Sequence, residues 1–157
     1  MLAGLTEAEV AYVVIGGVAA TVHGSARVTN DLDICYDQSD ANTRRLAALL
    51  ASWDAYPWQW PDGLPFFMDA RTFRMTPTMT LNTSQGRLDV LHRVEPIGDY
   101  AACRAVSTDE TAFGHTVPVL DLAPLIAAKR YANRPKDRDA LPELEALLAQ
   151  AAEDGTG

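Results

Sequence analysis

The sequence predicts an α/β protein, α+β in the narrower sense, in which helices flank a small mixed sheet and the C-terminal part is helical. Three observations support this class. The apolar, β-branched segment Tyr12–Ile15 ends at a double glycine, as a buried strand does before a tight turn. Polar and apolar residues alternate over Asp31–Tyr36, which is typical of a strand with one covered face. From Asp121 onward, apolar residues recur at helical spacing instead.

Short local signals define the first elements. Thr6 and Glu9 have the spacing of a capping box and predict a short helix that begins at Thr6. After the strand Tyr12–Ile15, small apolar residues over 18–23 predict a helix that packs against the sheet. Gly24 is expected to end that helix, so the first unit is strand, glycine turn and helix.

The later elements are assigned in the same way. Leucines at helical spacing predict a helix over residues 40–53. Prolines interrupt residues 56–65 and predict an irregular or partly extended loop. Residues 76–91 predict a β-hairpin with a longer turn. Pro142 is expected to begin the last helix.

Length and composition indicate one globular domain. At 157 residues, the chain is expected to form a single domain, 1–157, with its helical segment from about residue 121. The 48% hydrophobic and 22% charged residues argue against disorder or a fibrous repeat. The apolar run over residues 10–20 is too short to span a membrane and lacks a preceding basic segment. Cys35 and Cys103 form no C-x-x-C pair, so we expect a cytoplasmic protein.

The charge of the chain limits its partners. A formal net charge of -8 argues against broad, charge-driven binding to nucleic acid. Arginines and lysines nevertheless cluster locally, so one face could still hold a nucleic-acid end. The clusters are Arg71 with Arg74, Arg87 with Arg93, and the basic residues between Lys129 and Arg138.

Three aspartates are the strongest candidates for chemistry. Side chains at i and i+2 of a strand share one face, with Cα atoms about 6.6 Å apart, so Asp31 and Asp33 can bind common ions. Asp89 supplies a third carboxylate from another strand. Paired magnesium ions in phosphoryl-transfer sites lie about 3.5–4 Å apart and need carboxylates on rigid neighbouring strands. A D-x-D pair alone is more often solvated, but the preceding glycine pair and the third aspartate favour a metal site.

Gly16 and Gly17 have two interpretations. Free backbone N–H groups at this turn could cradle phosphates while the carboxylates hold metal. Alternatively, the pair only lets a strand turn tightly into a helix. It is neither a dinucleotide G-x-G-x-x-G motif nor a P-loop, because no Gly-Lys-Ser or Gly-Lys-Thr follows.

These residues carry a resemblance to a known family. An apolar strand, G-G, D-x-D and a later strand aspartate resemble the nucleotidyltransferase superfamily with the DNA polymerase beta-like fold. More narrowly, GGVAATVHGSARVTNDLD and LIAAKRYANRPKDRDAL are similar to the small AbiEii-like enzymes of toxin–antitoxin systems. The resemblance implies phosphate binding by Gly16 and Gly17, and by Lys129 of the late helix. It implies metal binding and catalysis by the three aspartates Asp31, Asp33 and Asp89.

The resemblance also implies cofactors and partners. Two Mg²⁺ ions and an NTP substrate are expected, with transfer of an NMP to a hydroxyl group. The acceptor could be an RNA end, a protein or a small molecule, and an antitoxin protein is a possible partner. No membrane partner is expected.

Several other side chains keep two interpretations. Ser25 is a candidate for nucleotide binding, but no base lies beside it in sequence, so it is not expected to act as a nucleophile. Arg27 either contacts the triphosphate or neutralises the D-x-D pair when no metal is bound. The three histidines are too scattered for a zinc site. The tryptophans Trp53, Trp58 and Trp60 either pack in the core or a loop, or form a surface on which a base could stack.

Two functions therefore remain at this stage. One is a magnesium-dependent nucleotidyltransferase, in which Asp89 positions or deprotonates the acceptor hydroxyl. The other is a non-catalytic binding or partner-regulated module with the same fold. Nucleotide binding without turnover would favour the second function, and a neighbouring antitoxin gene would favour a toxin.

Overall fold

The computed structural model describes residues 1–61 and 63–154 and confirms the predicted α/β class. Within these ranges, seven strands form one mixed sheet in the order β3-β4-β5-β2-β1-β9-β8, and β6 and β7 form a separate ribbon. The strands are β1 (Tyr12–Ile15), β2 (Asp31–Tyr36), β3 (Tyr56–Pro57), β4 (Met79–Thr83), β5 (Gly86–Leu91), β6 (Arg93–Val94), β7 (Gly98–Asp99), β8 (Ser107–Ala112) and β9 (His115–Leu120).

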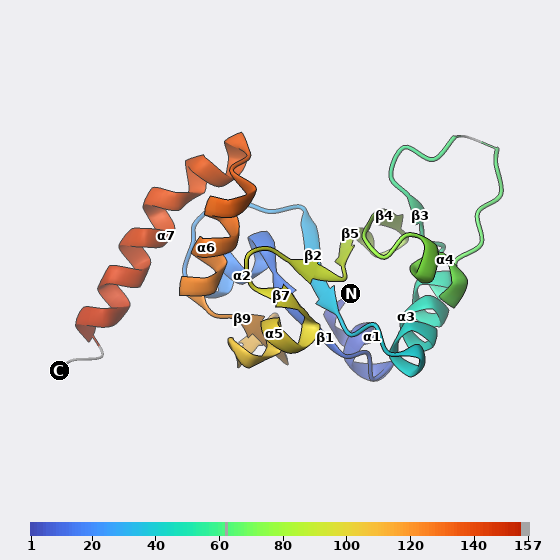
Figure 1. Cartoon of the computed structure of the whole chain (residues 1–157), viewed down its shortest axis with the longest axis horizontal. Coiled ribbons are helices and arrows are strands. Elements are labelled where there is room, and N and C mark those ends of the chain that lie inside the picture. Colours follow the sequence, from blue (N-terminus) through green and yellow to red (C-terminus); the bar gives the residue numbers. More distant parts are fainter. Residues whose placement is uncertain (62, 155–157) are drawn as a thin grey trace.

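Helices flank the sheet. Figure 1 shows α6 and α7 beside α2 on one side of the picture, α3 and α4 near β3 on the other, and α5 between them. The helices are α1 (Leu2–Glu7), α2 (Gly16–Val22), α3 (Asp40–Ser52), α4 (Ala70–Met75), α5 (Tyr100–Ala105), α6 (Leu122–Ala132) and α7 (Pro135–Asp154).

The central strands are fixed by burial. All four residues of β1 are buried, as are Leu32 and Ile34 of β2 and Leu88 and Val90 of β5. Because side chains alternate between faces, this burial leaves the odd-numbered residues of β2 and β5 on the opposite face. Strands β2 and β5 are parallel, and Asp33 lies opposite Asp89. The hydrophobic pattern therefore sets the register that brings the aspartates together.

The structure corrects two expected helix boundaries. The first helix is Leu2–Glu7 and does not begin at Thr6, because Leu2 and Leu5 lie one turn apart and are both buried. The last helix begins at Pro135, and Pro142 lies inside it. Proline fits the first turn of a helix, where its missing N–H costs nothing, so Pro135 is the start signal.

Other expectations hold with small shifts. Strands β1 and β2 have the predicted bounds, and β4 and β5 form the predicted hairpin with a turn of only Ser84 and Gln85. Cys35 and Cys103 are free and buried. No helix in the described ranges is long and apolar enough to cross a membrane.

Candidate active site

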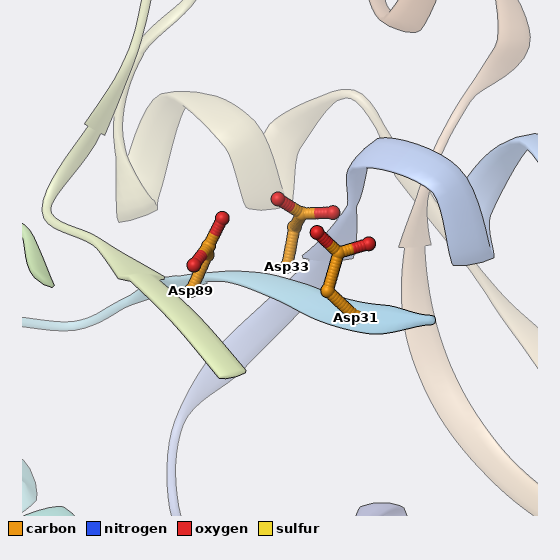
Figure 2. A group of neighbouring side chains, drawn as sticks. All are labelled: Asp31, Asp33 and Asp89. Carbon is orange, nitrogen blue, oxygen red and sulfur yellow. The ribbon is translucent and has the colours of Figure 1, made fainter. Parts of the chain in front are cut away.

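The three predicted aspartates converge on one face of the sheet. Asp31 and Asp33 come from β2, Asp89 from the neighbouring β5, and one carboxylate oxygen of each lies within 4.8 Å of the others. Figure 2 shows all three side chains pointing to the same side of the two strands. Each is partly buried. Such a set can offer oxygen ligands to a hard divalent cation.

Asp33 is the electrostatic centre of this triad. Its pKa is raised from 3.8 to about 6, chiefly by burial and then by the charges of Asp31 and Asp89. A hydrogen bond from the Gly17 backbone N–H and the positive charge of Lys136 only partly offset these effects. The folded protein therefore holds a carboxylate whose negative charge is poorly compensated by its own residues.

The other two carboxylates differ in their partners. The Thr29 hydroxyl donates to Asp31 Oδ1 at 2.7 Å, which fixes the orientation of that carboxylate. Among the described residues, Asp89 Oδ1 is buried without a hydrogen-bond partner. Buried polar atoms are normally satisfied, so this orphaned oxygen fits the role of a ligand to a divalent cation.

The two glycines make room for this arrangement. Gly16 has φ +65, and a Cβ there would lie 2.1 Å from Asp33 Oδ2. A Cβ at Gly17 would lie 2.5 Å from Thr29 Oγ1, the hydroxyl that orients Asp31. The glycine pair thus makes a tight turn and also allows both carboxylates of the D-x-D pair to approach the start of α2.

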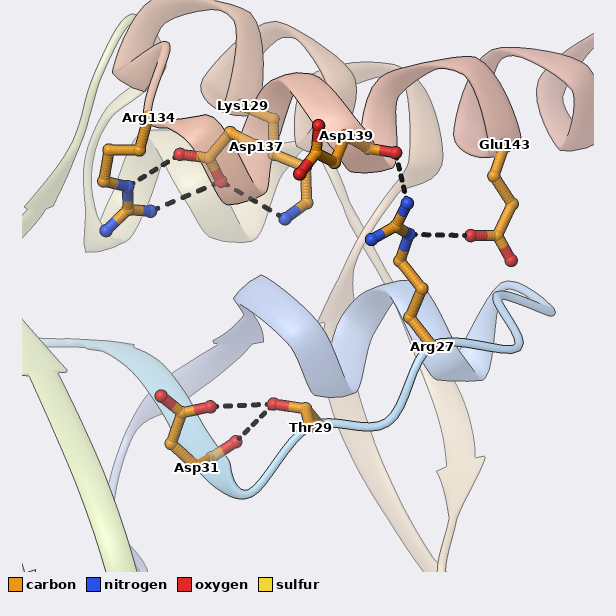
Figure 3. Close-up of polar contacts among 8 residues, drawn as sticks. All are labelled: Arg27, Thr29, Asp31, Lys129, Arg134, Asp137, Asp139 and Glu143. Carbon is orange, nitrogen blue, oxygen red and sulfur yellow. Dashed lines mark hydrogen bonds and ion pairs between the residues drawn. The ribbon is translucent and has the colours of Figure 1, made fainter.

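A basic cluster faces the triad from α6, α7 and the turn between them. Figure 3 shows Lys129 on α6, Asp137 on α7 and Arg134 just before α7, all above β2. The Arg134 Nε donates to Asp137 Oδ2 at 2.6 Å, and the Lys129 Nζ lies 3.5 Å from Asp137 Oδ1. Burial raises the pKa of Asp137, but the hydrogen bond from Arg134 and the charges of Arg134 and Lys129 outweigh it and hold that pKa below its ordinary value. Asp137 is fully buried and therefore orients both cations.

Ser25 and Arg27 lie farther along the same wall. The Arg27 Nε forms an ion pair with Glu143 at 3.2 Å, and its guanidinium donates to the Asp139 carbonyl. Arg27 thus contacts α7 and does not pair with the D-x-D motif. Ser25 is buried, and its Oγ accepts a hydrogen bond from the Arg27 backbone N–H at 3.3 Å.

Two adjoining cavities meet at the triad. One, of about 350 Å³, is lined by Gly16, Gly17, Ser25, Arg27, Asp31, Arg87, Lys129, Arg134 and Lys136 among others. The second, of about 450 Å³, contains Asp89 with Thr78, Thr80, Arg93 and Tyr131. Asp33 lines both cavities, whereas Asp31 lines only the first and Asp89 only the second. Every predicted site residue therefore lines one or both of these adjoining cavities, which we together call the cleft.

Sequence reasoning missed several residues of this cleft. Arg134, Lys136 and Asp137 belong to the RPKD segment that follows Lys129, and Thr29 precedes the D-x-D pair. The sequence contained one indication of this part of the cleft: three basic residues stand close to an aspartate just after a helix. That spacing alone does not distinguish a solvated connection from a buried ion-pair cluster.

The fold is shared with nucleotidyltransferases of known structure. The solution structure of the antibiotic-resistance factor ANT(2'')-Ia has a TM-score of 0.57 and 13% identity, covering 99% of this chain and 89% of that one. The crystal structure of ANT(2'')-Ia in complex with adenylyl-2''-tobramycin gives a TM-score of 0.57 at 14% identity, over 98% and 93% of the two chains. A candidate nucleotidyltransferase from Thermotoga maritima gives a TM-score of 0.57 at 15% identity, over 90% and 85%.

The likeness is one of fold. No protein-family model matches the chain, and no curated protein matches it in sequence. The chain has a nucleotidyltransferase-like fold, and its chemistry has to be argued from its own cleft.

Proposed function

We propose that this chain is a magnesium-dependent nucleotidyltransferase that moves an NMP from an NTP to a hydroxyl group of an acceptor. The observation that carries the proposal is the triad of Asp31, Asp33 and Asp89, within 4.8 Å of one another and opposite a basic cluster. Carboxylates on rigid strands suit divalent cations, and cations across a cleft suit a triphosphate. The fold and the adenylated tobramycin in one ANT(2'')-Ia structure support the same class of reaction.

Each residue has a role in this proposal. Asp31 and Asp33 would hold two Mg²⁺ ions, with Asp89 as the third ligand. When bound, such ions neutralise charge on the phosphates. Lys129 and Arg134, oriented by Asp137, bind the β- and γ-phosphates beside Gly16 and Gly17.

The reaction balances without a further reactant. The acceptor oxygen forms a bond to the α-phosphorus, and the bond between the α-phosphorus and the bridging oxygen breaks. Pyrophosphate leaves with that oxygen, and Asp89 positions the hydroxyl and accepts its proton. In an in-line displacement, the attacking and leaving oxygens lie on opposite sides of the phosphorus.

A labelled-transfer assay tests this function. We expect label from α-³²P-NTP to enter RNA, protein or small-molecule acceptors with Mg²⁺, while label from γ-³²P-NTP appears in pyrophosphate. Asp33→Ala should abolish both signals. Absence of transfer from a wild-type protein that binds Mg-NTP would instead support a non-catalytic binding module.

The narrower assignment is also part of the proposal. We place the chain among the small AbiEii-like enzymes of toxin–antitoxin pairs, acting in the cytoplasm as one domain, on the sequence resemblance quoted above. A neighbouring gene whose product binds this chain and suppresses its transfer activity would support that assignment. Growth unaffected by expression of the active protein alone would argue against a toxin.

A further inference from the structure

The catalytic face of the sheet continues beyond the triad to an aromatic side chain. The Trp58 backbone N–H donates to the Thr80 carbonyl at 2.8 Å, which extends the pairing of β3 with β4 by one residue. Thr80 lies opposite Asp89, and Asp89 lies opposite Asp33. Residues directly opposite one another share a face, so Trp58, Thr80, Asp89 and Asp33 form one row across four strands. Figure 1 shows β3 on the side of the sheet away from α6 and α7.

Trp58 is held in place by an arginine from the catalytic strand. The Arg87 guanidinium carbon lies 3.8 Å from the centroid of the Trp58 ring, a cation–π contact. Arg87 pairs with Asp31 in the register and lines the smaller cavity of the cleft. Its Nε is buried without a hydrogen-bond partner among the described residues, and Trp58 is 46% exposed. The result is an aromatic ring, partly open to solvent, that lies against an arginine of the strand that also carries Asp89.

The other exposed tryptophan of this segment has a structural explanation. The Trp60 Nε1 donates to the Leu64 carbonyl at 3.0 Å, and its ring packs edge-to-face on Phe66 at 5.1 Å. Trp60 therefore fixes the shape of its own loop. Neither contact involves Trp58, whose ring lies against the Arg87 guanidinium.

The geometry of the proposed transfer indicates which substrate would contact the Trp58 ring. The phosphates are expected near Lys129 and Arg134, so the leaving pyrophosphate is on the side of α6 and α7. An in-line attack then brings the acceptor from the Asp89 side, toward β4 and β3. Trp58 lies two strands from Asp89, about 10 Å at the usual strand spacing. A nucleotide whose terminal hydroxyl is at Asp89 can reach Trp58 with its base.

Resting on the proposed function, we propose that Trp58 and Arg87 form a stacking site for an unpaired base at the end of a single-stranded nucleic-acid acceptor. An aromatic ring beside an arginine is the combination that binds single strands, because every base has a stackable face. Only one cation belongs to the site, and the chain carries a net charge of -8. Binding should therefore depend weakly on salt and require a free end rather than a long phosphate track.

The test is binding of a fluorescein-labelled single-stranded RNA octamer of mixed sequence, measured by anisotropy with Mg²⁺ and a non-hydrolysable NTP. Loss of one stacked base costs about 1–3 kcal/mol, so Trp58→Ala should weaken binding by about 5-fold to 140-fold. Trp58→Phe should retain most of the affinity. Phe113→Ala removes a more exposed ring, 74% exposed, from the β8–β9 hairpin and is the control.

The outcomes separate this inference from the function on which it rests. In parallel, the thermal stabilisation by Mg-NTP is measured for every variant, and we expect Trp58→Ala to retain it. A wild type without that stabilisation contradicts the proposed function. If Mg-NTP still stabilises both proteins, the stacking site is contradicted when the octamer binds wild type and Trp58→Ala equally, or binds neither. The same assay with a DNA octamer tests whether the sugar contributes. An equal loss of affinity for the RNA and DNA octamers in Trp58→Ala supports stacking. Binding of a duplex as tightly as a single strand overturns the stacking site.

Discussion

Asp33→Asn is expected to make the metal-free protein more stable at alkaline pH while removing one ligand of the proposed metal site. In the folded state the pKa of Asp33 is raised from 3.8 to about 6, first by burial and then by Asp31 and Asp89. The difference is about 2 pKa units, and each unit corresponds to about 1.36 kcal/mol, so ionising Asp33 costs the folded state about 3 kcal/mol at pH 8. Asparagine removes this cost and can still accept the hydrogen bond from Gly17.

The stability gained by Asp33→Asn depends on pH. A raised folded pKa means that the folded state binds the proton more tightly than the unfolded state. The contribution of Asp33 is therefore fully present below pH 3.8 and is lost as the pH rises through about 6. The advantage of Asp33→Asn should accordingly grow from near zero at pH 4 to about 3 kcal/mol at pH 8.

Urea unfolding of wild type and Asp33→Asn from pH 5 to pH 8, in the presence of EDTA, measures this difference. Asp40→Asn, which removes an exposed acid of α3, controls for the change in net charge. A mutant less stable than wild type at pH 8, or a difference that does not change between pH 5 and pH 8, would refute the reasoning.

Three further substitutions test the rest of the cleft. Asp137→Ala leaves Lys129 and Arg134 without their buried partner, so it should lower the free energy of unfolding by about 3–5 kcal/mol and weaken NTP binding in calorimetry; unchanged stability would exclude Asp137 as the organising group. Gly16→Ala places a Cβ 2.1 Å from Asp33 Oδ2 at φ +65 and should abolish transfer while costing about 1–3 kcal/mol in urea unfolding; an active variant would mean that the turn can shift freely. Arg27→Ala removes a half-exposed ion pair, so stability should change by less than about 1 kcal/mol, and a higher KM for NTP with normal stability would identify Arg27 as a phosphate contact.

The parts of the fold that the sequence predicts are those in which local pattern and burial agree. The strands at Tyr12–Ile15 and Asp31–Tyr36 were predicted with their observed bounds, because β-branched residues and period-two alternation are strong local signals. The β8–β9 hairpin was missed. Its first strand, Ser107–Ala112, has a mainly polar sequence and is stabilised by pairing with β9 along its whole length. That stabilisation is tertiary and leaves little trace in the local sequence.

The candidate site divides in the same way. The three aspartates could be placed on one face because strand periodicity fixes the direction of a side chain. Their assembly still depended on β2 and β5 being neighbours, which only the complete sheet order shows. Arg134 and Asp137 were missed because, although they are only three residues apart, the second ion pair of Asp137, with Lys129, depends on the packing of α6 against α7. The sequence predicted that Arg27 contacts either the triphosphate or the D-x-D pair. In the structure Arg27 forms an ion pair with Glu143, which is distant in sequence.

The most direct test of the central claim is the melting temperature of the protein with Mg²⁺, with NTP and with both. Ligand at 100 times its Kd stabilises a folded state by about 2.7 kcal/mol, which corresponds to roughly 5–10 °C for a chain of this size. If the triad and the basic cluster form one Mg-NTP site, the two ligands together should raise the melting temperature clearly more than either alone. The double variant Asp31→Ala and Asp33→Ala should remain folded and lose that increment. Equal shifts in the wild type and the double variant would contradict the metal site and leave the three aspartates as an ordinary acidic face.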